Sequence, residues 1–174
     1  MDKKIKFKMI IADILMALLL IFADQITKIW VTPLKESGPI VLINNVFEIR
    51  YLENHGAAFG ILQGKQIFFL IISVVVYAAI IYVLAKMPTG KRYIPMQACL
   101  VFIFAGAVGN TIDRFAFGYV RDFLYFKLID FPIFNVADIY ITCSVIVFAL
   151  LFLLFYKEEE LEFLSLKKKP SSKE

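Results

Sequence analysis

Four aspartates that stand at or near the ends of apolar segments are the residues best suited to chemistry. They are Asp24, Asp113, Asp122 and Asp138. An aspartate at the centre of a membrane-spanning helix costs about 2.5 to 3.5 kcal/mol, so carboxylates beside apolar segments require an explanation. Two carboxylates held together at a poorly solvated site do not both ionise readily: one keeps its proton and acts as an acid, and the other acts as a base toward water. This is the chemistry of aspartic peptidases.

Polar residues accompany three of these aspartates at the spacing of a helix. They are Lys28 after Asp24, Asn110 before Asp113, and Asn135 before Asp138. Side chains three or four residues apart share a helix face, so Asp24 can pair with Lys28. Asn110 can pair with Asp113 or Arg114 in the same way. A purely structural network has the same pattern, and headgroups alone can solvate a single boundary aspartate, but four aspartates at one face favour a site.

Other catalytic chemistries lack the residues they require. His55 is the single histidine, so a zinc site of the H-E-x-x-H type and a Ser-His-Asp triad lose support. A Ser-Lys dyad through Lys28 stays open, although no outer serine has a spacing that recommends it. Cys99 and Cys143 are each expected to be a small buried hydrophobe without a disulfide. We expect no metal and no cofactor.

The composition indicates an all-α protein with several membrane spans. Sixty per cent of the 174 residues are hydrophobic, and the mean hydropathy is +0.76. A spanning helix needs about 20 mostly apolar residues, and four segments qualify: 9–30, 67–85, 93–112 and 136–156. We expect one membrane domain over residues 1–156, with outer loops at 31–66 and 113–135, and a charged, solvated, partly disordered tail at 157–174.

The lysines and arginines predict the orientation of these spans. Twelve lie on the side that carries both termini, and six lie on the opposite side. By the positive-inside rule both termini are cytoplasmic, and the four aspartates approach the outer face. Asp13 lies near the inner end of the first span and is given no catalytic role. The net charge of +4 is thus explained by membrane orientation, and no nucleic-acid partner is expected.

Two shorter patterns predict further structure. Residues 47–51 alternate apolar and polar side chains with the period of a strand, which indicates a small β-element in the first outer loop. Gly106 and Gly109 in the third span predict close approach of another helix.

Five ordered segments carry a resemblance to a known family. They are Asp24-Gln25-Ile26-Thr27-Lys28, Asn54-His55-Gly56-Ala57-Ala58-Phe59-Gly60, Gly109-Asn110-Thr111-Ile112-Asp113-Arg114, Gly118-Tyr119-Val120-Arg121-Asp122-Phe123 and Phe134-Asn135-Val136-Ala137-Asp138. Together they resemble lipoprotein signal peptidase, also called signal peptidase II. The resemblance runs from Asp24 to Asp138 with matching four-span topology, and the ordered set is far more specific than any one segment.

The resemblance implies a bacterial inner-membrane enzyme that cleaves diacylglyceryl-modified prolipoproteins just before the lipidated cysteine and that globomycin-type peptides inhibit. It implies that Asp122 and Asp138 are catalytic, a choice that the residues alone left open among four. It also implies an outer β-cradle around residues 47–51. The residues that would bind substrate or brace the site are Asp24, Lys28, Asn54, Gly56, Asn110, Asp113, Arg114, Asn135 and Ala137. We expect a monomer in the bilayer.

The sequence departs from the family pattern at two places. Glu53 stands where many members have a basic residue, and Ile139-Tyr140 follow Asp138 where small hydroxyl residues are usual. Arg121 is expected to point away from Asp122, because neighbours in an extended segment face opposite sides.

Two other functions fit a small membrane protein with acidic residues. A proton-coupled transporter or channel subunit predicts acidic residues spread through the membrane depth, whereas the second span has no charged residue. A structural partner subunit predicts that replacing the aspartates changes assembly more than chemistry.

Overall fold

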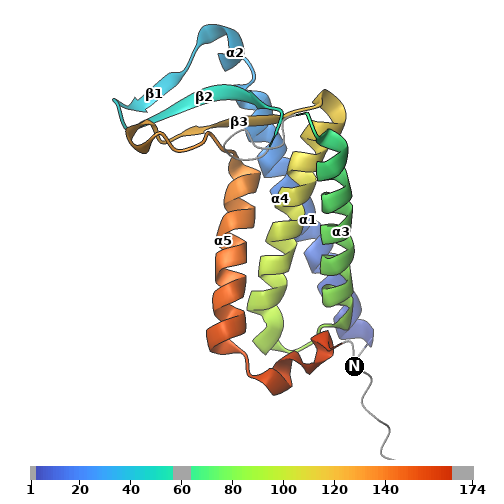
Figure 1. Ribbon diagram of the computed structural model, residues 1–174. Helices are drawn as coiled ribbons and strands as arrows, with labels where there is room; N and C mark the ends of the chain where they lie inside the picture. The colour runs from blue at the N-terminus through green and yellow to red at the C-terminus, as the bar shows by residue number, and fades with distance from the viewer. Residues whose placement is uncertain (1–2, 57–63, 166–174) are drawn as a thin grey trace, which may run out of the picture.

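Four long helices run side by side, and a small sheet lies across one end of them (Figure 1). This computed structural model describes residues 3–56 and 64–165. The long helices are α1 (Lys3–Val31), α3 (Gln66–Lys86), α4 (Ile94–Phe117) and α5 (Val136–Leu150), which continues as the π-helical turn η4 (Leu151–Phe155). Short helices α2 (Leu34–Ser37), η2 (Lys91–Tyr93), η3 (Lys127–Ile129) and η5 (Glu158–Leu164) complete the described helices.

Three helices in the described ranges are long and apolar enough to cross a membrane. They cover Gln66–Lys86, Lys91–Phe117 and Val136–Phe155. Apolar side chains on their outward faces, such as Ile71, Val74 and Leu153, are exposed. These helices indicate a multi-pass membrane protein. The 29-residue α1 is not one of the three, so the expected first span at 9–30 is not confirmed.

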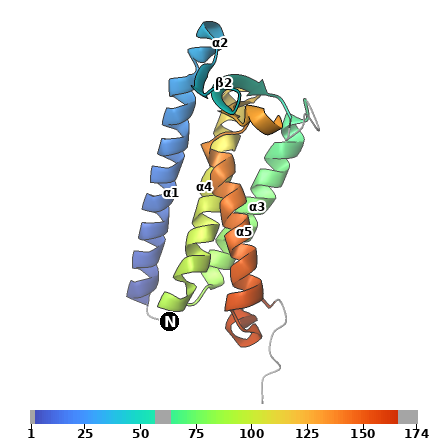
Figure 2. The ribbon, with the colours of Figure 1, turned by 90° about the vertical axis from the view of Figure 1, so that its left-hand side faces the viewer.

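Helix α4 is the central helix of the bundle and packs against α1, α3 and α5 (Figure 2). Its small residues make this packing close. A Cβ added at Gly106 would lie 2.6 Å from the backbone oxygen of Ala137 in α5. A Cβ added at Gly109 would collide with the Asp24 carboxylate of α1. The close approach expected at these two glycines is confirmed.

The sheet contains three antiparallel strands in the order β1-β2-β3. Strand β1 (Ile40–Ile43) and strand β2 (Phe47–Asn54) come from the segment between α1 and α3, so the expected β-element is confirmed. Strand β3 (Val120–Tyr125) comes from the segment between α4 and α5 and was not predicted. Its Asp122 is paired with Leu52 of β2. The sheet therefore joins both connections above the helix ends and fixes the position of Asp122.

Helix α4 continues beyond the expected span end at residue 112. It ends at Phe117, where Gly118 adopts the left-handed conformation at φ 78°. Asp113 and Arg114 are therefore helical rather than part of a loop. Helix α5 begins with a capping box: the Asn135 side chain accepts from Asp138 N–H, and the Asp138 carboxylate accepts from Asn135 N–H. This cap fixes the Asp138 side chain at the helix start.

The segment after α5 differs from the solvated tail expected at 157–174. Helix η5 folds back at the end of the bundle opposite the sheet, where α1 also begins (Figure 1). Arg92 forms an ion pair with Glu160 at 2.8 Å, and Tyr93 stacks on Tyr156. Leu161 and Phe163 pack against the adjacent apolar cluster, because burying them removes apolar surface from water. Residues 166–174 of the expected tail lie outside the described residues.

Candidate active site

The four aspartates singled out by sequence meet at the sheet end of the bundle. Asp24 comes from α1, Asp113 from α4, Asp122 from β3 and Asp138 from the first turn of α5. A continuous set of hydrogen bonds and ion pairs joins them through Lys28, Asn110 and Asn135. Buried polar groups of this kind require such partners, because an unpaired charge in a low-dielectric site is costly.

Lys28 of α1 supplies a buried cation between Asp24 and Asp113. Its Nζ lies 2.9 Å from Asp24 Oδ2 and 3.8 Å from Asp113 Oδ2, and all three side chains are fully buried. The expected pairing of Asp24 with Lys28 is confirmed. Lys28 Nζ also donates to Asn110 Oδ1 at 2.9 Å. Asp24 Oδ1 in turn accepts from Ala137 N–H at 3.0 Å, so the charged group connects α1, α4 and α5.

Arg121 supplies a second buried cation on the strand side. Its Nη2 lies 2.7 Å from Asp113 Oδ1, and its backbone N–H donates to Asp113 Oδ2 at 2.9 Å. Arg121 Nη2 also donates to Gln25 Oε1 at 3.1 Å. Burial disfavours the charged guanidinium, but the hydrogen bond to Asp113 and the negative charge of Asp113 together outweigh burial and raise the pKa of Arg121. Arg121 thus points away from Asp122, as expected, and ties β3 to α4.

Sequence reasoning did not assign Gln25 or Arg121 to the site. Each is the direct neighbour of an aspartate that it did assign, namely Asp24 and Asp122. Gln25 Nε2 donates to Asp24 Oδ2 and to Gly109 O, both at 3.0 Å. The signal that could have found both residues is their place inside the two aspartate motifs.

Three asparagines hold Asp122 and Asp138. Asn54 Nδ2 donates to Asp122 Oδ2 at 2.8 Å, and Asn135 Nδ2 donates to Asp122 Oδ1 at 2.6 Å. The backbone N–H of Asn135 donates to Asp138 Oδ2 at 3.0 Å, and Asn110 Nδ2 donates to Asp138 Oδ1 at 2.8 Å. Every oxygen of the two carboxyl groups therefore has a donor, which fixes the orientation of both.

The expectation that Asn110 pairs with Asp113 or Arg114 is wrong. Asn110 Oδ1 accepts from Lys28 and also from Asn135 Nδ2 at 3.1 Å. The Asn110 side chain is thus bonded to both Lys28 and Asp138, so Lys28 helps to fix the position of the Asp138 carboxylate. Helix spacing allowed the local pairing, but the packing of α5 against α4 offered the side chain other partners.

Asp122 and Asp138 line one cavity of about 380 Å³. The polar residues Asn54, Asn110, Arg114 and Thr142 also line this cavity, together with Gly56, and the remaining wall is largely apolar. The apolar lining comprises Val120, Phe131, Pro132, Ile133, Phe134 and Ile139. A cavity with a few convergent polar groups and an apolar wall is typical of a site that binds an amphipathic or apolar substrate.

Arg114 places a cation in this cavity. Its guanidinium lies 4.6 Å from the centre of the Phe69 ring, and its Nη2 lies 3.4 Å from Gly56 O. Its Nε is buried and has no partner in the described part of the protein. A buried donor of this kind can bind an acceptor of a bound molecule.

Burial and the neighbouring Asp138 carboxylate raise the pKa of Asp122 to about 7. The hydrogen bonds from Asn54 and Asn135 act in the opposite direction. An aspartate with this pKa can hold a proton near neutral pH, which is the requirement for an acid in hydrolysis.

The other sequence-selected residues brace the site or flank it. Asp24, Lys28, Asp113 and Ala137 do not line the cavity but hold the residues that do. Residues 57–60 of the second motif lie outside the described residues. Cys143 lines the cavity and is exposed, so its expected burial is wrong. The reason is that Cys143 lies on the part of α5 that borders the cavity, which leaves its side chain accessible.

Of the departures from the family pattern, Ile139 lines the cavity and Glu53 does not. Glu53 forms an ion pair with Lys35 at 2.7 Å, and this contact lowers the pKa of Glu53. Within residues 3–56 and 64–165, no group of three or more His, Cys, Asp and Glu side chains is placed to hold a metal ion.

Comparison with known proteins identifies the family. The model of the family described as Signal peptidase (SPase) II matches residues 16–155. The lipoprotein signal peptidase of Streptococcus pyogenes serotype M1 is 40% identical over 148 residues, which cover 84% of this chain and 94% of that protein. The lipoprotein signal peptidase of Clostridioides difficile (strain 630) is 39% identical over 147 residues, 84% of this chain and 97% of that protein.

Two solved structures described as bacterial membrane enzymes have the same fold. The first, at 2.3 Å resolution, has a TM-score of 0.71 and 35% identity over 93% of this chain and 94% of that one. The second, at 1.9 Å resolution, has a TM-score of 0.70 and 36% identity over 83% of this chain and 94% of that one. These matches confirm the resemblance carried by the five motifs, and the chain belongs to the signal peptidase II family.

Proposed function

We propose that this protein is an aspartyl endopeptidase that removes the signal peptide from diacylglyceryl-modified prolipoproteins, cleaving just before the lipidated cysteine. The observation that carries the proposal is the pair Asp122 and Asp138, which line one cavity and are both hydrogen-bonded to Asn135. The apolar wall of that cavity suits a substrate that carries lipid. The names of the relatives support this class of substrate.

Asp122 acts as the acid and Asp138 as the base in the proposed reaction. A water between the two carboxyl groups loses a proton to Asp138 and attacks the peptide carbonyl carbon. Asp122 donates its proton to the carbonyl oxygen, and a tetrahedral diol forms. The carbon–nitrogen bond then breaks, the diol returns its hydroxyl proton to Asp122, and Asp138 passes its proton to the leaving amine. Both carboxyl groups end as they began.

The surrounding network positions this pair. Asn110 and Asn135 orient the Asp138 carboxylate, and Lys28 holds Asn110. Arg121 and Asp113 fix β3 above α4, so that Asp122 stays at the cavity. The Arg114 guanidinium is placed to bind a carbonyl oxygen of the substrate.

The proposed setting is the bacterial cytoplasmic membrane, with four spans that include α1, both termini in the cytoplasm and the site near the outer face. The ends of the described chain support this topology, because α1 begins and η5 lies at the same end of the bundle (Figure 1). The sheet at the other end would then stand outside the cell as the family's β-cradle. In this proposal the protein acts as a monomer, because one chain supplies all of the residues that line the cavity. Globomycin-type peptides would compete with the prolipoprotein for that cavity.

Purified protein in phospholipid vesicles tests the proposal with Asp122→Asn and Asp138→Asn. Each variant is expected to lose cleavage of a lipidated prolipoprotein by at least a thousandfold, because asparagine can neither take nor give the proton. Asp130→Asn is the matched control, since Asp130 lies outside the cavity and its left-handed backbone accepts asparagine.

Retained cleavage in either active-site variant, with the protein folded in the membrane, would overturn the assignment of that residue. Aspartate-dependent ion flux through the vesicles without any cleavage would replace the proposal with the transporter alternative.

A further inference from the structure

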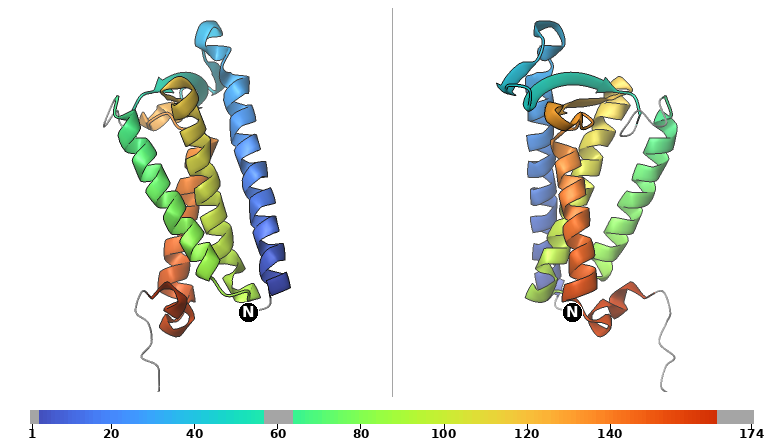
Figure 3. Two further views of the ribbon diagram at one scale, coloured as in Figure 1. Left: turned by 90° about the vertical axis from the view of Figure 1, so that its right-hand side faces the viewer. Right: turned by 60° about the vertical axis from the view of Figure 1, so that its left-hand side comes forward.

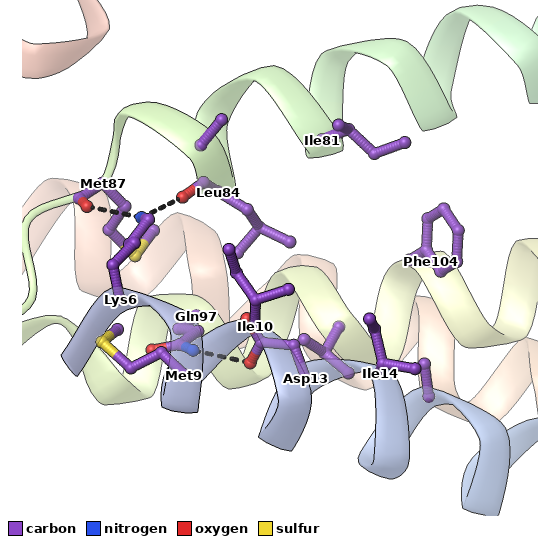
Figure 4. Close-up of a pocket in the computed structure, with 13 residues that line it drawn as sticks. Lys6, Met9, Ile10, Asp13, Ile14, Ile81, Leu84, Met87, Gln97 and Phe104 are labelled. Carbon is purple, nitrogen blue, oxygen red and sulfur yellow. Dashed lines mark hydrogen bonds between the residues drawn. The ribbon is translucent and has the colours of Figure 1, made fainter. Parts of the chain in front are cut away.

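A second cavity, of about 360 Å³, lies between α1, α3 and α4. It is at the end of the bundle opposite the sheet, where α1 and α3 flank α4 (Figure 3). Figure 4 shows its apolar walls, with Ile10 and Ile14 from α1, Ile81 and Leu84 from α3, and Phe104 from α4. Because α3 and α4 are candidate spans, this cavity opens to lipid in the membrane half that carries the N-terminus.

This cavity is separate from the candidate active site. Gln97, Val101 and Phe104 of α4 line it, whereas Asn110 and Arg114 of α4 line the cavity that contains Asp122 and Asp138. At about 3.6 residues per turn, the mean directions of these two sets differ by roughly 130°, so the two cavities border different faces of α4. The peptidase reaction proposed above therefore does not use the second cavity.

Lys6 closes the cavity at its membrane-surface end (Figure 4). Its Nζ donates to Leu84 O at 2.6 Å and to Met87 O at 2.9 Å, at the carboxyl end of α3. An ammonium group has three N–H donors, so one remains for a bound acceptor. A cation held at the mouth of an apolar cavity matches a ligand with an anionic head and an apolar tail.

The polar residues deeper in the cavity bond to each other. Gln97 Nε2 donates to Asp13 Oδ1 at 2.6 Å (Figure 4). This bond connects α4 to α1 and leaves the rest of the wall apolar. The tail of the ligand therefore needs no polar group.

The segments that meet at this end of the bundle are rich in basic residues. These residues are Lys3, Lys6 and Lys8 at the start of α1, Lys86 at the end of α3, and Lys91 in η2, and of them Lys6 lines the cavity. A cluster of this kind attracts anionic lipid headgroups. It disfavours the positively charged first region of a signal peptide, so charge decides between the two occupants.

We propose that this cavity binds one acyl chain of an anionic phospholipid from the leaflet that faces the N-terminus, with the lipid phosphate contacting Lys6. The lipid fills the space between α1 and α3. It holds α1 and α3 together at the end of the bundle where Lys6 donates to the backbone oxygens of Leu84 and Met87.

Native mass spectrometry tests the proposal with full-length protein reconstituted with equal amounts of phosphatidylglycerol and phosphatidylcholine. The protein is expected to retain one phosphatidylglycerol in preference to phosphatidylcholine. Lys6→Gln keeps a donor for the α3 carbonyls but removes the charge, and it should lower that preference by roughly fivefold. Lys6→Arg should restore it. Ala85→Phe, which places a ring in the cavity lining, should lower retention of both lipids.

Ala79→Phe is the matched control, because Ala79 is an exposed alanine of α3 that does not line the cavity, and retention should not change. A phosphatidylglycerol with a photoreactive group in its acyl chain should label Ile10, Ile14 or Phe104. Equal retention of the two lipids by the unmodified protein would overturn the proposal. Cross-linked dimers or labelled signal peptide at these residues, in place of lipid, would also overturn it, by identifying another occupant.

Discussion

Asp122 and Asp138 accept hydrogen bonds from one residue, Asn135, through its side-chain N–H at 2.6 Å and its backbone N–H at 3.0 Å. Asn135 is also the residue that caps α5. The start of a helix, a strand and two carboxyl groups are thus connected by a single residue, through its side chain and its backbone. The charge of Asp138 raises the pKa of Asp122, so a change in the charge of one carboxyl group acts directly on the other.

The pH dependence of cleavage follows from the pKa of Asp122, which burial and Asp138 raise to about 7. The proposed acid form of Asp122 is present below that pH and is lost as the pH rises through about 7. We therefore expect kcat/KM for a lipidated substrate to fall above about pH 7. Asn54→Ala removes a hydrogen bond that lowers this pKa, so it should move the fall to higher pH. A rate that instead increases through pH 7 would contradict the role of Asp122 as the acid.

Lys28 should contribute strongly to stability. Lys28→Met leaves the buried Asp24 carboxylate without its cation and removes one of the positive charges beside Asp113. The loss of one partner of a buried ion pair lowers the free energy of unfolding by about 3 to 5 kcal/mol. Thermal unfolding in detergent should show a much lower midpoint. Adding Asp24→Asn should recover part of the loss.

Lys35→Met is the control for Lys28, because its pair with Glu53 is exposed and solvent screens the attraction, so the unfolding midpoint should change little. Equal midpoints for the two lysine variants would show that the buried network contributes little to stability.

Arg121 is expected to be a positioning residue for Asp122. Arg121→Gln removes the charged contacts with Asp113 that hold β3 on α4, and each such bond is worth about 1.5 to 3 kcal/mol. We expect kcat to fall roughly tenfold or more, because Asp122 is no longer held in position. The change in KM should be smaller, because the apolar lining of the cavity that binds the substrate stays in place. Arg121→Lys should recover only part of the rate, since lysine lacks the forked donor geometry.

Arg50→Gln serves as the control for Arg121, because Arg50 pairs with Glu48 in β2, away from the cavity, and is partly exposed. A variant of Arg121 with unchanged kcat would show that β3 keeps its place without this contact.

Gly106→Ala should destabilise the packing of α4 against α5. The added methyl group would meet Ala137 O at 2.6 Å and the Ile141 side chain at 2.8 Å, so the helices must separate. Overpacking of this kind costs about 1 to 3 kcal/mol. Gly90→Ala adds a methyl group at ordinary contact distance from Tyr93 and should leave the unfolding midpoint nearly unchanged. Similar midpoints for the two variants would contradict the close approach at Gly106.

Local features were predictable because the helix itself fixes them. The pairing of Asp24 with Lys28 follows from their spacing of four residues, which places both on one helix face. The close approach at Gly106 and Gly109 follows from the missing side chains. The orientation of Arg121 away from Asp122 follows from the alternation of a strand.

Long-range features were not predictable from spacing. Strand β3 is paired with β2, which comes from a distant part of the chain and offers it hydrogen-bond partners. Asn110 was expected to bond within its own helix but bonds to α1 and α5 residues, because packing brings stronger partners to it. Residues 158–164 fold back because Leu161 and Phe163 find an apolar surface at the bundle end.

The sequence by itself thus determined which residues could carry acid–base chemistry, in what order they occur, and that they would gather at one end of the helices. Only the tertiary structure decided that Asn135 connects Asp122 to Asp138, that Arg121 holds Asp113, and that both carboxyl groups line one cavity. The physical reason is that side-chain type and helix spacing are properties of the chain, whereas a shared cavity depends on how separate elements pack.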